Sequence, residues 1–209
     1  MLNVTYAITV CNELEEITRL INFLHPRIQS DDDILIQYDE VGVTKEVKDY
    51  LDIVNTLHRN IKVIGFPLND DFATFKNNLK EHAKGMFIFQ IDADEIPHEY
   101  LIENMHLLLE SNKDVDLFFV PRVNTVEGLT NKHIKKWGWR VNENGWVNWP
   151  DVQTRLYRRT SEIEWVGKVH EKIVNYNTLT MLPFEEQFSL YHPKDIDRQE
   201  KQNDYYETL

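Results

Sequence analysis

Residues 86–95 read MFIFQIDADE, and this stretch is the clearest indication of the fold. Its first six residues are apolar except for one glutamine, as in a parallel strand that is buried on both faces. Three carboxylates follow at once, on Asp92, Asp94 and Glu95. Ligands of parallel sheets bind at the carboxyl ends of the strands. We therefore expect a ligand site directly after this strand.

Strand and helix patterns alternate on both sides of this stretch. Strands are predicted where β-branched and aromatic residues gather, and helices where apolar residues recur every three or four positions. This succession predicts an α/β fold with a Rossmann-like, mostly parallel central sheet that is flanked by helices on both faces. The predicted strands are 3–10, 33–38, 61–66, 86–91 and 115–121, and the predicted helices are 12–26, 44–57, 71–83 and 97–110.

The second part of the chain, from about residue 122, has a different pattern. Four of the five tryptophans lie between positions 137 and 149. Short strand-like pieces and a final polar helix predict a small mixed α+β portion, at 153–158, 162–165, 173–174 and 194–209. Because no linker rich in Pro, Gly or Ser separates the parts, we interpret 1–209 as a single domain whose second portion covers one side of the ligand crevice.

Composition excludes several classes of protein. The 209 residues include 35 acidic and 23 basic side chains, a formal net charge of −12, which disfavours nucleic acid as a partner. The basic stretches 132–140 and 155–159 favour a solvated surface, with a local basic face as the alternative. A single cysteine, Cys11, excludes an intramolecular disulfide and fits a reducing compartment. No apolar run approaches the ~20 residues of a membrane span, and we expect neither a transmembrane segment nor a signal peptide.

The carboxylates after residue 91 favour a metal site. Three carboxylates at the mouth of a buried strand repel one another unless a cation is present. Oxygen ligands suit Mg²⁺ or Mn²⁺, which use one or two carboxylates together with substrate phosphates. The alternative is a turn in which Asp94 or Glu95 caps the next helix.

Further polar residues stand at or near predicted strand ends. Asp39 follows the second strand, where it can accept hydrogen bonds from a base or a ribose, or simply form a turn. Lys76 lies in the third helix, where it can reach a phosphate or remain solvated. His192 and Lys194 can clamp a diphosphate, or belong to a loop before the final helix.

Two carboxylates are candidates for a general base. Glu171 can take a proton from an acceptor, with His170 orienting it or binding metal or phosphate. Asp151 is the rival base. A surface strand is the alternative for the segment 165–171 that contains His170 and Glu171. There is no GxGxxG, GxxxxGK[ST] or GxSxG pattern. We interpret Cys11 as a small core residue, with a role as a nucleophile as the alternative.

Taken together, these segments resemble the family 2 glycosyltransferases, which have the GT-A fold. ITVCNE at 8–13 is similar to the family's T-x-x-N-E segment, and Asp39 falls where the family has an aspartate. DFATFKN at 71–77 resembles its "dFa..rN" helix, with Lys76 in place of arginine. FQIDADE at 89–95 resembles its "flDaDE" metal motif. DVQTRLYRR at 151–159 and GKVHE at 167–171 are similar to a bacterial and phage-type subgroup.

The resemblance implies roles for individual residues. Residues 1–121 would form a nucleotide-binding half and 122–209 an acceptor-side half. Glu171 would be the base, with Asp151 as the rival. The implied metal ligands are Asp92, Asp94 and His192, and the implied acceptor-binding residues are Trp139, Trp149 and His170. The donor would be held by Thr9, Cys11, Asn12, Glu13, Asp39, Lys76, Asn77, Asp92, Ala93 and Lys194.

The implied function is a metal-dependent inverting glycosyltransferase that uses Mn²⁺ or Mg²⁺. Its donor would be a nucleotide-sugar, a UDP-sugar first of all, and its acceptor a hydroxyl of a glycan, a lipid-linked molecule or another compound. It would be cytoplasmic, with peripheral contact to the inner membrane face as a further expectation. The alternatives are a non-catalytic nucleotide- or carbohydrate-binding protein on a degenerate transferase fold, and a sugar nucleotidyltransferase. Tryptophans 137–149 can stack on sugar rings or pack on one another.

Overall fold

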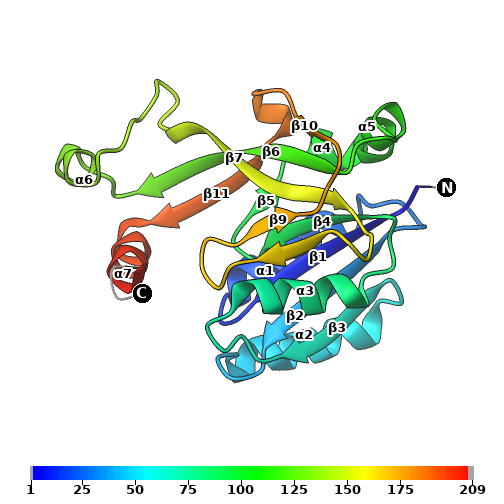
Figure 1. The fold of residues 1–209 in the computed structure, drawn as a ribbon. Helices are drawn as coiled ribbons and strands as arrows, with labels where there is room; N and C mark the ends of the chain where they lie inside the picture. Colours follow the sequence, from blue (N-terminus) through cyan, green and yellow to red (C-terminus); the bar gives the residue numbers. More distant parts are fainter. Residues whose placement is uncertain (1, 207–209) are drawn as a thin grey trace.

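The structure, a computed structural model, describes residues 2–206, with side chains described up to residue 201. One large sheet runs through the molecule, with strands in the order β3-β2-β1-β4-β7-β6-β11-β5 and β10 paired to β6 (Figure 1). Its strands are β1 (Val4–Val10), β2 (Asp33–Asp39), β3 (Ile61–Phe66), β4 (Phe87–Asp92), β5 (Ile96–Pro97), β6 (Leu117–Glu127), β7 (Val147–Arg158), β10 (Leu179–Met181) and β11 (Leu190–Asp195). A separate hairpin pairs β8 (Glu164–Val166) with β9 (Lys172–Val174).

The helices cover this sheet on both faces. They are α1 (Leu14–Leu24), α2 (Lys45–Leu57), α3 (Phe72–His82), α4 (Glu99–Glu103), α5 (Met105–Ser111), α6 (Asn131–Trp137) and α7 (Ile196–Tyr206), with a 3₁₀ turn at Glu186–Phe188. Alternate residues of β1 point to opposite sides. Ile8 joins a core with Ile17 of α1 and Leu51 of α2, whereas Ala7 joins a second core with Leu79 of α3.

The sheet is mostly parallel, as predicted. β1 pairs in parallel with β2 and β4, β2 with β3, and β6 with β10 and β11. The exceptions are β7, which runs antiparallel between β4 and β6, and the short β5 beside β11. In the β1–β4 pair, Thr9 stands opposite Asp92. The carboxyl ends of four neighbouring strands therefore meet at one edge.

Several predicted boundaries need correction. The helix predicted at 97–110 is divided into β5, α4 and α5, with Asn104 at the junction of the two helices. Glu13, not Asn12, occupies the N-cap position of α1, and its carboxylate accepts the main-chain N–H groups of Cys11 and Asn12. The side chain of Glu13 therefore stabilises the loop between β1 and α1.

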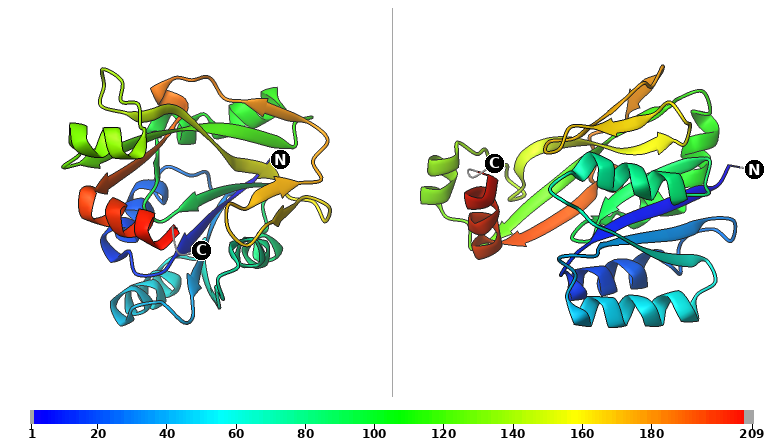
Figure 2. Two further views of the ribbon diagram at one scale, coloured as in Figure 1. Left: turned by 60° about the vertical axis from the view of Figure 1, so that its left-hand side comes forward. Right: turned by 60° about the horizontal axis from the view of Figure 1, so that its bottom comes forward.

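The second half differs more from its prediction. The strands expected at 115–121 and 153–158 are the inner ends of the long strands β6 and β7. The final helix begins at Ile196, not at Lys194, because residues 190–195 form β11; residues 207–209 lie outside the described residues. The outer ends of β6 and β7 extend beyond the body and carry α6, with α7 nearby (Figures 1 and 2). In the part of the chain that the structure describes, no helix is long and apolar enough to cross a membrane.

Candidate active site

A cleft of about 800 Å³ lies at the strand edge defined by β1, β2 and β4. Its opposite wall comes from β6, β7, β11 and α7, so both halves of the chain contribute to it. Most of the site residues expected from the sequence line this one cleft. They are Thr9, Cys11, Glu13, Asp39, Lys76, Asp92, Ala93, Asp94, Trp139, Asp151, His170, Glu171, His192 and Lys194.

Three residues expected at the site are not among those that line the cleft. The amide of Asn77 donates to the main-chain oxygen of Trp165 (2.8 Å) and accepts from its N–H (2.9 Å). Both ends of this amide tie α3 to β8, so Asn77 joins two elements and does not present its side chain to the cleft, in contrast to the expectation that it holds the donor. Asn12 is exposed, and Trp149 packs edge-on against Trp146, with ring centroids 4.8 Å apart. The packing alternative therefore fits Trp149 best.

Asp39 organises one end of the cleft. Its carboxylate accepts N–H groups from Val41 (3.2 Å), Gly42 (3.0 Å) and Leu68 (3.0 Å), which joins the loops after β2 and β3. A Cβ atom at Gly42 would stand 2.7 Å from Asp39 Oδ2 and 2.8 Å from Cys11 Sγ. A side chain at position 42 would therefore push into this end of the cleft.

Cys11 is expected to be a slow nucleophile. Burial, with the carboxylates of Glu13 and Asp39 beside it, raises the pKa of the Cys11 thiol to about 11. Iodoacetamide at pH 8 should therefore alkylate it roughly 100-fold more slowly than a free thiol, because only the thiolate reacts. Mass spectrometry across a pH series should show a rate that climbs to pH 11, with urea-unfolded protein as the fast control. A plateau near pH 8.5 in the folded protein would contradict this assignment.

Asp92 is held as a carboxylate by three partners. It accepts from Thr9 Oγ1 (2.9 Å) and Arg155 Nη2 (2.6 Å), with Lys76 Nζ at 4.0 Å. Burial alone would raise the pKa of Asp92, but Arg155 and Lys76 hold it well below its usual range. Arg155 is itself buried and also binds Glu95 Oε1 at 2.6 Å. Protein cations thus balance the charge at the end of β4.

Glu95 has a structural role within the carboxylate cluster. Its side chain is fully buried, accepts the main-chain N–H of Asp92 (3.1 Å) and also binds Arg122 (3.0 Å). Glu95 therefore closes the turn after β4 but does not cap the next helix, whose N-cap is His98, whereas Asp92 and Asp94 line the cleft.

Asp94 lies beside His192, and both belong to the expected set of metal ligands. Asp94 Oδ2 is 3.3 Å from His192 Nε2 and 3.2 Å from Arg198 Nη2 of α7. Burial raises the pKa of Asp94, but hydrogen bonding and charge from His192, with Arg198 close by, bring it below its usual value. Within the described residues, no group of three or more His, Cys, Asp and Glu side chains is arranged to hold a metal ion.

This pair of side chains fits a divalent cation that shares its ligands with a substrate. A carboxylate oxygen and an imidazole nitrogen are both ligands that Mn²⁺ accepts, and Mg²⁺ also uses one or two carboxylates with phosphates. The oxygens of Asp92 already accept from Thr9 and Arg155. Asp94 and His192 are therefore the better candidates, with Asp92 beside them.

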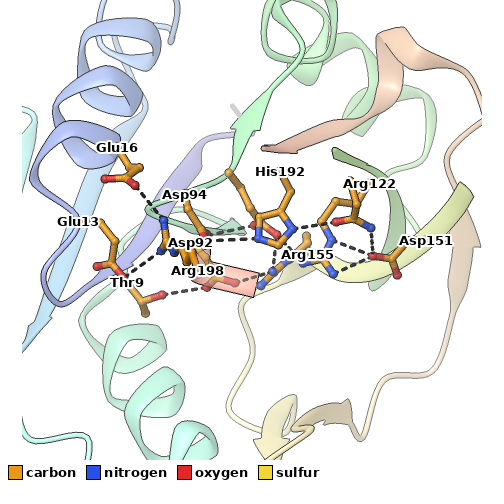
Figure 3. Close-up of polar contacts among 12 residues, drawn as sticks. Thr9, Glu13, Glu16, Asp92, Asp94, Arg122, Asp151, Arg155, His192 and Arg198 are labelled. Carbon is orange, nitrogen blue, oxygen red and sulfur yellow. Dashed lines mark hydrogen bonds and ion pairs between the residues drawn. The ribbon is translucent and has the colours of Figure 1, made fainter. Parts of the chain in front are cut away.

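Acidic and basic groups alternate along the cleft (Figure 3). Asn124 of β6 joins two parts of this row, because its amide contacts His192 Nδ1 (2.8 Å) and Asp151 Oδ2 (2.8 Å). The row runs through Glu16, Arg198, Asp94, His192, Asn124, Asp151, Arg122, Glu95, Arg155 and Asp92. The row holds five carboxylates and three arginines, so the arginines offset only part of its negative charge.

Asp151 is surrounded by donors. It accepts from Arg122 (2.7 and 2.9 Å), Asn124 (2.8 Å) and Gln153 (2.7 Å). Burial raises the pKa of Asp151, but Arg122 and the two amides bring it below its usual value. Asp151 is therefore a firmly ionised anchor and a weak proton acceptor.

Glu171 faces the same cleft in a different setting. Its Oε1 atom accepts from Lys76 Nζ at 2.6 Å, and the two side chains are 15% and 6% exposed. Lys76 also lies 4.7 Å from the ring centroid of Trp165. His170, the preceding residue, has a positive φ of 55° and lines the cleft. Lys76 thus holds Glu171 at the cleft surface instead of extending freely toward a ligand.

The sequence did not single out Arg122, Asn124, Arg155 and Arg198. Arg155 lies in the quoted RLYRR segment, but a lone arginine gives no sign of its partners. Arg122 and Asn124 lie just beyond the predicted end of the fifth strand, on the outer part of β6. If the predicted strand had been extended to residue 127, the alternation of side chains between its two faces would have indicated Arg122 and Asn124 as candidates.

Comparison with known proteins bears on this arrangement. A family model described as Glycosyl transferase family 2 matches residues 5–176. Two curated relatives are the SPbeta prophage-derived glycosyltransferase SunS of Bacillus subtilis (strain 168) and glycosyltransferase SunS of Bacillus phage SPbeta. Each is 22% identical over 189 residues, which are 90% of this chain and 39% of theirs. The chain thus spans about two fifths of these relatives.

Solved structures show the same fold. The crystal structure of S. aureus TarS 1–349 has a TM-score of 0.61, 14% identity, and coverage of 92% of this chain and 60% of its own. Its complex with UDP-GlcNAc has a TM-score of 0.63 with 14% identity, and coverage of 93% and 59%. The predicted GT-A arrangement of a mostly parallel sheet with flanking helices is therefore confirmed.

Proposed function

Because the chain belongs to glycosyl transferase family 2, we propose that its cleft transfers a sugar from a nucleotide-sugar donor to an acceptor hydroxyl. The observation that carries this proposal is the Asp94–His192 pair at the carboxyl edge of the sheet. The pair shares one cleft with Asp39 and with Glu171, which contacts Lys76 of α3. The four residues supply the groups that a nucleoside, a diphosphate and an acceptor need.

The donor we propose is a UDP-sugar. The TarS structures that share this fold were solved with UDP-GlcNAc and with UDP, which supports the choice of nucleotide. The nucleoside would lie against Thr9, Cys11 and Asp39, where the loops after β1 and β2 form the end of the cleft. A Cβ atom at position 42 would crowd Asp39 and Cys11, so glycine at this position leaves room for the nucleoside.

The diphosphate would lie near Asp94, His192 and Lys194. Asp94 and His192, with Asp92 beside them, would hold a divalent cation, which would neutralise the charge that develops on the leaving diphosphate. Burial, together with Arg122 and Arg198, lowers the pKa of Lys194. An arriving diphosphate favours the charged form of this lysine, so donor and lysine stabilise each other. Arg198 is close enough to Asp94 to join this contact.

Glu171 is the proposed base for the acceptor. The acceptor hydroxyl would lose its proton to Glu171 while its oxygen attacks the anomeric carbon, and the bond from that carbon to the diphosphate oxygen breaks. Attack from the face opposite the leaving group inverts the configuration in one displacement. Asp151 is the weaker candidate, because Arg122 and two amides hold its pKa low. Trp139 lines the acceptor side, where its ring can contact a sugar.

A non-catalytic nucleotide-binding protein is the second candidate. The contact between Lys76 Nζ and Glu171 Oε1 favours it, because an ammonium group occupies the proposed base. If the chain is a glycosyltransferase, Lys76 must move toward the donor or toward Asp92 when substrates bind.

The single cysteine supports a reducing compartment. We place the reaction in the cytoplasm, with peripheral contact to the inner membrane face.

Thermal unfolding against a panel of nucleotides, each with and without Mn²⁺, tests the proposal. A nucleotide at ~100 times its Kd should stabilise the protein by about 2.7 kcal/mol, a Tm increase of roughly 5–10 °C. We expect UDP to give this shift only when Mn²⁺ is present. A folded protein that shows no shift with any nucleotide would refute donor binding. A shift without sugar transfer to any acceptor would favour the non-catalytic candidate.

A further inference from the structure

The segment between β6 and β7, residues 128–146, forms an arm that stands away from the body (Figures 1 and 2). Its helix α6 has no buried residue. A helix of this length is not stable by itself in water. Thr130 and His133 form a capping box at its start, and Gly138 ends it in a left-handed conformation. The arm is therefore locally built, with little support from the core.

The arm carries a concentrated positive charge. Residues 131–140 read NKHIKKWGWR and contain four Lys or Arg residues with no acid. The side chains of Lys132, Lys135, Lys136 and Arg140 are all exposed. This charge contrasts with the net charge of −12 on the whole chain. The arm thus presents to solvent the opposite sign from the protein as a whole.

Aromatic side chains accompany the basic ones. Trp137 stacks on His133 with ring centroids 5.2 Å apart and meets Trp139 at 4.6 Å. Trp146 lies at the other end of the arm. All three indole rings are partly exposed, and Val141 is 36% exposed. Tryptophan is enriched at the level of lipid headgroups, because its ring is apolar while its N–H is polar.

We propose that this arm docks on the surface of an anionic lipid membrane. Lysines and arginines near such a surface are attracted to its headgroups, and partly exposed tryptophans insert among them. At ~0.1 M salt, charges more than about 10 Å away are largely screened. The acidic body therefore repels the membrane much less than its total charge suggests, provided that the projecting arm makes the contact.

Docking would place the cleft next to the membrane. Trp139 belongs to the arm and also lines the cleft, so the acceptor side opens where the arm binds. A lipid-carried hydroxyl acceptor could then reach Glu171 from the membrane. This use of the contact rests on the proposed glycosyl transfer, whereas the docking itself does not.

Sedimentation with lipid vesicles tests the docking. The full chain should bind vesicles of phosphatidylcholine that contain phosphatidylglycerol, with a blue shift of tryptophan emission, and should not bind pure phosphatidylcholine. Binding should weaken as salt is raised. Because each lysine near the surface contributes roughly fivefold to partitioning, the triple variant K132Q/K135Q/K136Q should partition about 100-fold less.

The matched control is K62Q/K84Q/K113Q, which removes the same charge from three exposed lysines outside the arm. It should bind like the unchanged protein, and both variants should keep the nucleotide-dependent Tm shift. Absence of binding to the anionic vesicles, or an equal loss in both variants, would overturn the docking. Binding of soluble polyphosphate but not of vesicles would also overturn it, and would assign the arm to an anionic polymer. None of these three results would alter the Tm shift, so the two proposals fail separately.

Discussion

Replacing Glu171 with glutamine is expected to lower the turnover number by about 10²–10⁴-fold, the usual contribution of a general base. Donor affinity should stay unchanged. Glutamine has the shape of glutamate and its carbonyl oxygen can still accept from Lys76, which lies 2.6 Å from Glu171 Oε1. The variant therefore removes the proton acceptor while the packing around Trp165 is kept.

The measurement is sugar transfer or donor hydrolysis at saturating UDP-sugar and Mn²⁺, with donor affinity taken from the Tm shift. E103Q is a matched control, since Glu103 is an exposed residue of α4. D151N separates the rival base. Full turnover in E171Q with loss in D151N would move the base to Asp151, despite the low pKa that Arg122 and its amide partners impose.

The second large effect is expected at Asp94. Asp94→Asn should weaken Mn²⁺-dependent nucleotide binding by at least about 100-fold, since even residues behind the ligands contribute 10–100-fold to metal affinity. The amide oxygen of asparagine can still contact His192 and Arg198, so the fold should persist. The variant should therefore lose the part of the Tm shift that Mn²⁺ adds and keep any part that UDP gives alone.

Asp31→Asn serves as the control for Asp94→Asn, because it makes the same change at an exposed position. His192→Ala should reproduce the effect of Asp94→Asn if the two side chains bind one ion. An Asp94→Asn protein that keeps the full Mn²⁺-dependent shift would remove Asp94 from the metal site. Separate effects of Asp94→Asn and His192→Ala would show that the 3.3 Å contact between these side chains is only an ion pair.

Local patterns predicted the first half of the fold closely. β1, β2, β3 and β4 begin and end within about two residues of the predicted strands, because each is a dense apolar run between turn residues. The insertion of β7 between β4 and β6 could not be read in the same way. Its register joins Phe87 to Arg158, residues that lie far apart in the chain, and no local pattern encodes such a pairing.

The division of the predicted helix 97–110 at Asn104 could not be predicted, for a related reason. Leu101, Ile102, Met105 and Leu109 are all buried, so their spacing satisfies one continuous helix as well as two short ones. Only the contact of β5 with β11 shows that residues 96–97 belong to the sheet.

The site was predictable where it depends on strand ends. Asp39, Asp92 and Asp94 were placed together because carboxyl ends of parallel strands share an edge. Their basic partners were not, since Arg155 and Arg198 come from β7 and α7, whose positions depend on long-range pairing. The same limit applies to Lys76, whose contact with Glu171 joins α3 to the loop before β9.

Arg198 would compete with the proposed cation for Asp94. One guanidinium group contacts Glu16 (2.8 Å), Glu13 (3.5 Å) and Asp94 (3.2 Å), so it links α7 to α1 and to the loops after β1 and β4. The Oδ2 atom of Asp94 has to give up this partner before it can face an incoming cation. For the proposed cation, the measured affinity would then be the intrinsic affinity multiplied by the fraction of molecules in which the guanidinium has moved away. Because Arg198 is one third exposed, salt weakens its hold, and measurements at low ionic strength understate what Asp94 and His192 can bind.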